Sequence, residues 1–127
     1  MAQNINVRKF AGTAASAAVI NSIIFLIAKS ADATMVINQG GSKKISLGMV
    51  IGVTFFALVI ASFFAALIGM KSQGFVSRAP LIGLVFSFIS TAVPFSASDD
   101  FKTSLGLATM HVVAGLFWYV GTKRSIR

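Results

Sequence analysis

The chain has 127 residues, of which 56% are hydrophobic and only 11% are charged, and its mean hydropathy is +0.86. Soluble domains carry about a quarter charged residues, so this chain lacks the polar side chains to cover a surface exposed to water. It contains no cysteine, which excludes disulfides, thiolate metal sites and cysteine nucleophiles. Its net charge of +8 favours anionic lipid over nucleic acid as a partner, because the basic residues lie at the ends of apolar segments.

Four segments are long and apolar enough to cross a bilayer, which takes about 20 helical residues. They are residues 10–28, 47–69, 79–97 and 103–121. We interpret Pro80 as the N-terminal proline of the third helix and Pro94 as a stop or kink near its end. The sequence therefore predicts an all-α integral membrane four-helix bundle that forms a single transmembrane domain over residues 1–127.

The first loop, on the side of the membrane opposite the termini, has the pattern of a short hairpin. The segments "TMVIN" (34–38) and "SKKIS" (42–46) flank "QGG", which supplies glycine for a turn. A lone two-stranded hairpin is marginally stable in water. The sequence therefore leaves open whether a short extracytoplasmic hairpin forms here; if it does, it must lie on the bundle or on a partner.

Lysine and arginine in the loops predict the orientation, because cytoplasmic loops are richer in them. The side of the termini has Arg8, Lys9, Lys71, Arg78, Lys123, Arg124 and Arg127, and the other side has Lys29, Lys43, Lys44 and Lys102. We expect a multi-pass protein of the cell (inner) membrane with both termini cytoplasmic; the bias is moderate, so an inverted or dual orientation stays open. Trp118 and Tyr119 are expected to anchor the fourth span at the interface on the side of the termini.

Small residues recur at four-residue spacing, which allows helices in lipid to approach each other closely. We interpret these residues as helix-packing surfaces within the bundle, or alternatively as a stripe that docks another protein chain. They are Gly48, Gly52, Ala57, Ala61, Ala65 and Gly69 in the second span, and Gly12 and Ser16 in the first.

The single histidine, His111, lies near the middle of the fourth span. It shares a helical face with Ser104, Ala108, Gly115 and Thr122, so we expect it to point into the bundle. There its imidazole needs one donor and one acceptor as partners, which Asn21, Thr91 or a backbone carbonyl would supply.

Asp99 and Asp100 precede the fourth span and are expected to cap its helix. Asp100 and His111 are about 16 Å apart along a helix, which excludes a direct hydrogen bond. The alternative is a water-filled polar path that joins the two aspartates to His111, Asn21 and Thr91.

The chain lacks a serine elbow, a zinc-binding helix motif and a phosphate-binding glycine loop. One histidine cannot build a metal or haem site without a second copy or a partner. We therefore expect no enzymatic activity, no catalytic residue and no cofactor.

Asn21, the "STAVP" that ends at Pro94, an acid before Thr103 and "LATMHVVAG" around His111 resemble a family of small four-span bacterial membrane proteins known only as a domain of unknown function. This resemblance covers most of the chain and implies a four-helix membrane fold and nothing catalytic. A small multidrug transporter would need a glutamate in its first helix, and the chain contains none. "VFSFISTAV" (85–93) is only a faint echo of the third-helix break of a fluoride channel.

The pattern predicts a protein that acts through helix–helix association, as an accessory or structural subunit of a membrane complex or as a homo-oligomer. Its expected partners are the lipid bilayer and other membrane subunits or itself, and not nucleic acid. The alternative is a small oligomeric transporter or channel with a polar path near His111.

Overall fold

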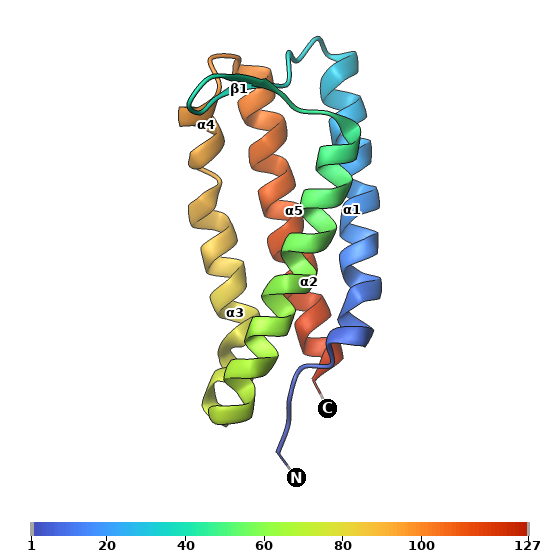
Figure 1. The fold of residues 1–127 in the computed structure, drawn as a ribbon, viewed down its shortest axis with the longest axis vertical. Coiled ribbons are helices and arrows are strands. Elements are labelled where there is room, and N and C mark those ends of the chain that lie inside the picture. The colour runs from blue at the N-terminus through green and yellow to red at the C-terminus, as the bar shows by residue number, and fades with distance from the viewer. Residues whose placement is uncertain (1, 127) are drawn as a thin grey trace.

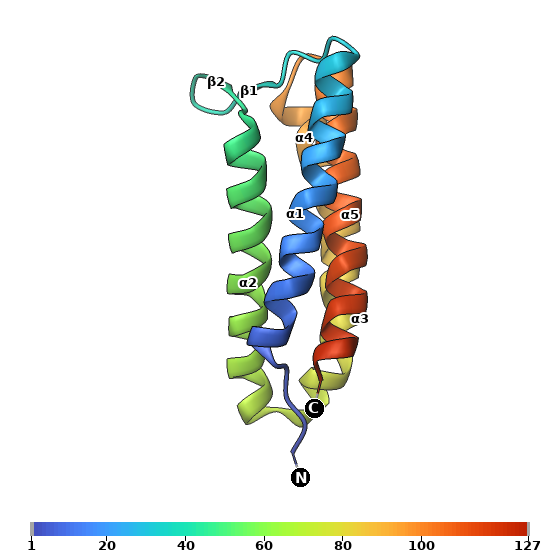
Figure 2. The ribbon, with the colours of Figure 1, turned by 90° about the vertical axis from the view of Figure 1, so that its right-hand side faces the viewer.

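The computed structural model describes residues 2–126 and confirms the predicted all-α membrane bundle (Figures 1 and 2). The helices are α1 (Val7–Ser30), α2 (Leu47–Lys71), α3 (Gln73–Ser90), α4 (Val93–Ala97) and α5 (Phe101–Ser125). Four segments are long and apolar enough to cross a membrane, with Gln73–Ala97 counted as one of them. Arg127, one of the cations used for the orientation, lies outside the described residues.

Side-chain caps explain where three of the helices begin. The Asn6 and Ser46 side chains accept hydrogen bonds from the backbone N–H groups of Lys9 and Met49, at the starts of α1 and α2. Asp100 does the same for α5, which confirms its predicted capping role. Each cap satisfies a backbone donor that the first helical turn leaves free.

The third span differs from the prediction at its start. α3 begins at Gln73, so Pro80 lies inside the helix, and its interpretation as the N-terminal proline is wrong. Pro80 cannot donate to the Val76 carbonyl one turn earlier, a loss that transmembrane helices tolerate. Beside it, Trp118 Nε1 donates to the Ala79 carbonyl at 2.8 Å, which ties this part of α3 to α5. The predicted break near Pro94 is confirmed, because α3 ends at Ser90 and α4 begins at Val93.

The first loop forms the hairpin that the sequence left open. β1 (Val36–Asn38) pairs antiparallel with β2 (Ser42–Lys44), and Val36 lies opposite Lys44. Gly40 and Gly41 in the turn have φ of 71° and 134°, a region that favours glycine. The hairpin covers the end of the bundle opposite the termini (Figure 1).

The helices do not pack evenly around one axis. α1 lies against both α2 and α5, and α3 lies against α5, whereas α2 and α3 contact each other much less. Phe10 and Trp118 meet edge to face at the centre of the core, with ring centroids 5.3 Å apart. Trp118 is 7% exposed, so it is a core residue and not the interfacial anchor that we expected. Because α2 is held mainly by α1, the side of the bundle between α2 and α3 is left uncovered.

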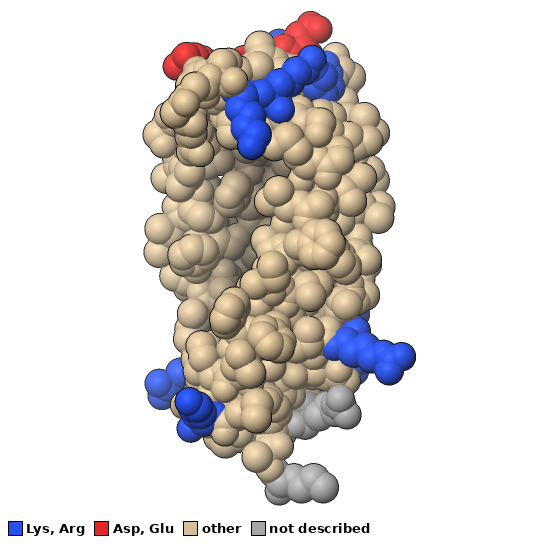
Figure 3. Space-filling view, viewed as in Figure 1, with Lys and Arg blue, Asp and Glu red and all other residues tan. Residues whose placement is uncertain are grey.

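Charge divides the molecule into two ends and a middle. Asp32, Asp99 and Asp100 all belong to the hairpin end, and the face in Figure 3 shows cations at both ends and none along the middle. The termini meet at the other end, where Ile5 bridges Ile126 and the Asn6 N–H donates to the Ser125 carbonyl at 2.8 Å. An uncharged middle is what a hydrocarbon core requires.

Candidate functional site

A cavity of about 730 Å³ lies between α2 and α3, with α5 behind it. We call it the lateral groove, because it opens on the side of the bundle, where the space-filling view is hollowed (Figure 3). Its walls are mostly apolar and extend from Ile37 and Ile45 near the hairpin to Ile68 and Phe75 near the other end. The groove therefore faces the bilayer.

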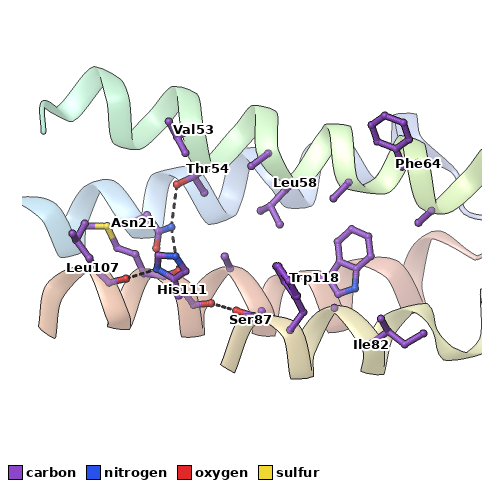
Figure 4. A pocket seen from close by; sticks show the side chains of 18 of the residues that line it. Asn21, Val53, Thr54, Leu58, Phe64, Ile82, Ser87, Leu107, His111 and Trp118 are labelled. Atoms are coloured by element: carbon purple, nitrogen blue, oxygen red, sulfur yellow. Dashed lines mark hydrogen bonds between the residues drawn. The ribbon is translucent and has the colours of Figure 1, made fainter. Parts of the chain in front are cut away.

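Four polar side chains meet at the floor of the groove, near mid-membrane depth. They are Asn21 of α1, Thr54 of α2, Ser87 of α3 and His111 of α5. Asn21 Nδ2 donates to Thr54 Oγ1 at 3.1 Å, and the Ser87 hydroxyl donates to the His111 carbonyl. Figure 4 shows Asn21, Thr54 and His111 gathered at one place in the groove, with Ser87 beside His111.

The tautomer of His111 follows from its backbone partner. Nδ1 lies 2.7 Å from the Leu107 carbonyl oxygen, which can only accept, so Nδ1 carries the proton. In the neutral ring, Nε2 then presents a lone pair, and it has no hydrogen bond among residues 2–126. His111 is therefore an acceptor on the groove floor.

Asn21 is a second acceptor without a donor. The residue is only 2% exposed, and its Oδ1 has no hydrogen-bond partner in the described part of the chain. A buried unpaired oxygen costs about 1–3 kcal/mol, and the bilayer core holds no bulk water to relieve it. The floor therefore holds two acceptors without donors, His111 Nε2 and the buried Asn21 Oδ1.

The predicted acids lie elsewhere, just before α5, where they bind the first loop. Asp100 accepts hydrogen bonds from Thr103 Oγ1 at 2.6 Å and from the Thr34 N–H at 2.9 Å, and Asp99 accepts one from Asn38 Nδ2 at 3.0 Å. The Thr103 hydroxyl and then the Thr34 amide lower the pKa of Asp100 from 3.8 to about 2. These contacts dock the hairpin on the start of α5.

The structure thus brings together two of the five predicted polar residues, Asn21 and His111. The Thr91 hydroxyl donates to the Phe88 carbonyl of its own helix at 2.6 Å, and Thr91 does not line the groove. Sequence reasoning missed Thr54 and Ser87 as members of the floor. The available signal was a hydroxyl in the middle of an otherwise apolar span.

The small residues of α2 and α1 fall into two groups. Ala57, Ala61 and Ala65 line the lateral groove, and a Cβ on Gly69 would touch Val76 and Asn4. A Cβ on Gly12 or Gly52 would meet nothing within 4 Å, on Gly48 it would meet only Ser46 at 3.9 Å, and Ser16 is exposed. These four residues therefore make no close helix–helix contact within one chain.

The close helix contacts of α5 are made by three glycines, of which the sequence analysis placed only Gly115 on an inward face. A Cβ on Gly83 would overlap the Trp118 indole, one on Gly115 would lie 2.5 Å from Ser87, and one on Gly121 would lie 2.5 Å from Thr13. These three contacts join α3 and α1 to α5. The predicted inward face of α5 is confirmed by buried Ser104, Ala108, Gly115 and Thr122, with His111 half-buried.

Comparison with protein families finds one match over almost the whole chain. The family is described as "Family of unknown function (DUF6069)", and its profile matches residues 2–127. No curated protein and no solved structure matches the chain. The resemblance to a membrane-protein family known only as a domain of unknown function is therefore confirmed.

Proposed function

The chain belongs to the DUF6069 family, and from its geometry we propose a non-enzymatic, multi-pass membrane protein whose lateral groove binds a lipophilic molecule that carries a hydrogen-bond donor. One observation carries this proposal: two acceptors without donors, Asn21 Oδ1 and His111 Nε2, lie on the floor of an otherwise apolar groove. A hydroxyl on a long apolar body matches both features.

The size and the position of the groove support a small occupant. Ligand pockets commonly measure roughly 300–1,000 Å³, are mostly apolar, and contain a few polar groups that orient the ligand. The groove, at about 730 Å³, falls inside this range. Its side opening lets a molecule enter from the lipid without crossing the hairpin or the bundle ends.

The proposal has no catalytic step. The His111 ring bonds the Leu107 carbonyl, and the Ser87 hydroxyl donates to the backbone carbonyl of His111, so the proposal gives this ring only the role of an acceptor for the occupant. No cofactor is proposed.

A second candidate function is helix–helix association, as an accessory subunit or homo-oligomer. It is favoured by the open α2 surface, where Ala57 and Ala61 are exposed and a Cβ on Gly52 meets nothing. Small residues let a neighbouring transmembrane helix approach closely. In this case the lateral groove would hold a helix of a second copy or of another subunit. In the transporter alternative, the molecule bound in the lateral groove would be released on the other side of the membrane.

Binding is measured with two probes that differ only in the donor, 1-dodecanol and dodecane. Trp118 lines the groove and is the only tryptophan, so its emission reports an occupant. We expect the alcohol to bind the purified protein at least tenfold more tightly than the alkane. Asn21→Leu should remove most of this preference and change stability by less than about 1 kcal/mol, because an interhelical hydrogen bond in a membrane contributes about 0.6 kcal/mol on average.

Two matched substitutions on α2 locate the site. Ala61→Phe fills the groove and should abolish binding of both probes, whereas Ile60→Phe, on the exposed side of the same turn, should leave both unchanged. Equal binding of alcohol and alkane by the wild type would contradict the proposal. Native mass spectrometry of the gently extracted protein distinguishes helix association from ligand binding. A second chain that is present in stoichiometric amount with the wild type and is lost from Ala61→Phe would establish association.

The expected orientation is also a proposal, and the cysteine-free chain allows a clean test. Ser42→Cys places a thiol on the hairpin, and Gly74→Cys places one on the exposed first turn of α3, at the end where the termini lie. If the termini are cytoplasmic, a membrane-impermeant maleimide should label the Ser42→Cys variant in intact cells and the Gly74→Cys variant only after lysis. The reverse pattern would show the inverted orientation, and labelling of both in intact cells would show a dual one.

A further inference from the structure

A second furrow, of about 360 Å³, lies between α1 and α5 at the end where the termini meet. Lys9 of α1 and Arg124 of α5 are its cations, and both are exposed. The other lining residues are Gly12, Thr13, Ser16, Phe117, Val120 and Ser125. The furrow therefore joins a cationic mouth at the end of the bundle to an uncharged channel along α1 and α5.

Two of the small residues without a helix partner, Gly12 and Ser16, line this furrow. A Cβ on Gly12 would meet nothing within 4 Å, so the surface is open along one turn of α1. Phe117 and Val120 form the facing wall on α5. Such a shallow apolar channel on the side of a membrane protein accommodates part of an acyl chain.

The mouth of the furrow also contains an unsatisfied polar group. Ser125 is 1% exposed, and its hydroxyl oxygen has no hydrogen-bond partner within residues 2–126. A hydroxyl can donate to an anionic oxygen. The furrow thus offers one buried donor beside two cations.

The surroundings favour an anion at this mouth. All aspartates of the chain belong to the hairpin end, and the chain has no glutamate, so no acidic side chain competes for Lys9 and Arg124. α1 begins at Val7, close to Lys9, and the N-terminal end of a helix is partially positive. Arginine and lysine both bind phosphate oxygens, arginine in a bidentate manner.

We propose that this furrow is a binding site for an anionic phospholipid, with the phosphate held by Lys9, Arg124 and the Ser125 hydroxyl and an acyl chain along Gly12 and Ser16. The site is separate from the lateral groove, because it lies between α1 and α5 and shares no residue with it. It does not depend on the function proposed above.

Native mass spectrometry with added phosphatidylglycerol or phosphatidylcholine tests the site on the purified full chain. The wild type should bind one phosphatidylglycerol in clear preference to phosphatidylcholine. Lys9→Gln and Arg124→Gln should each weaken this binding about fivefold and together about thirtyfold, from the usual contribution of one basic residue near an anionic headgroup. The matched control, Lys71→Gln with Arg78→Gln, removes the same charge from outside the furrow and should retain it.

Filling the furrow separates a lipid from a free anion. Gly12→Leu and Ser16→Leu keep all charges, occupy open or exposed positions, and should each reduce binding of phosphatidylglycerol at least tenfold. Glycerol 3-phosphate should compete weakly, because it lacks the acyl chain. Competition as strong as that of the lipid would overturn the lipid assignment in favour of a soluble phosphate. An equal loss in the Lys71→Gln, Arg78→Gln control would show diffuse charge attraction and no site.

Discussion

Replacing Gly83 with alanine is expected to destabilise the bundle by about 1–3 kcal/mol, the usual cost of overpacking a well-packed core. The added Cβ would overlap the Trp118 indole, which is 7% exposed and packs edge to face on Phe10. Trp118 would have to move, and its hydrogen bond to the Ala79 carbonyl would be lost next to Pro80, where the helix already lacks a backbone donor. Thermal unfolding in detergent, followed by circular dichroism, measures this loss.

Gly52→Ala is the matched control for that experiment. Gly52 also lies inside a long transmembrane helix, but a Cβ there meets nothing within 4 Å. Alanine should therefore be neutral or stabilising by about 0.5–1 kcal/mol, because it restricts the unfolded chain more than glycine does. If Gly83→Ala unfolds at the same temperature as Gly52→Ala, the Trp118 contact is not as described. Trp118→Phe combined with Gly83→Ala should recover part of the loss, since the smaller ring leaves room for the methyl group.

Thr103→Val is expected to release the hairpin while leaving the bundle folded. The Thr103 hydroxyl donates to Asp100 at 2.6 Å and accepts from the Met35 N–H at 2.9 Å, and Met35 is fully buried. Valine has the same shape but leaves the Met35 amide unpaired, which costs about 1–3 kcal/mol. Hydrogen exchange of residues 31–46 should speed up by one to two orders of magnitude. Thr109→Val, which removes only a bond to Leu105 on the exposed face of α5, should leave it unchanged.

Acid should also release the hairpin, because protonation of Asp100 weakens its hydrogen bonds to Thr103 and Thr34. The pKa of Asp100 is lowered from 3.8 to about 2 in the folded protein, so the unfolded state binds its proton more readily. Asp100 therefore contributes its full stabilisation above about pH 4, and this contribution is lost as the pH falls through about 2. The protection of the hairpin amides, measured as their exchange relative to the intrinsic rate at each pH, should fall over that window in the wild type and be independent of pH there in Asp100→Asn. An unchanged window in Asp100→Asn would assign the transition to another group.

Much of the fold was predictable because membrane insertion depends on local properties. Apolar length alone determines which segments cross the bilayer, and the caps at Ser46 and Asp100 act on the next three residues. The start of α3 was not predictable in this way, because the polar stretch before Pro80 reads as a loop. It is helical because α3 packs on α5 and Trp118 bonds the Ala79 carbonyl, and both contacts come from residues far along the chain.

The candidate site was only half predictable. Polar residues inside apolar spans are conspicuous, so Asn21 and His111 could be chosen from the sequence. Asp99 and Asp100 are equally conspicuous, but they bind the hairpin, whose docking depends on contacts with Thr34 and Asn38. Regularly spaced small residues likewise mark a helix surface that another helix or a lipid can approach closely. They do not specify which, since a Cβ on Gly12 or Gly52 would meet no other helix of the described chain.

The sequence by itself determined an all-α membrane protein with four apolar spans, the last of them capped by Asp100, because these follow from apolar length and from groups within a few residues. The tertiary structure alone decided that α2 stays apart from α3, which opens the lateral groove, and that α1 packs on α5, which places Asn21 and His111 on its floor. Lipid solvates an apolar helix face as well as another helix does, so hydrophobicity cannot choose between them. Steric fit and hydrogen bonds between distant residues make that choice.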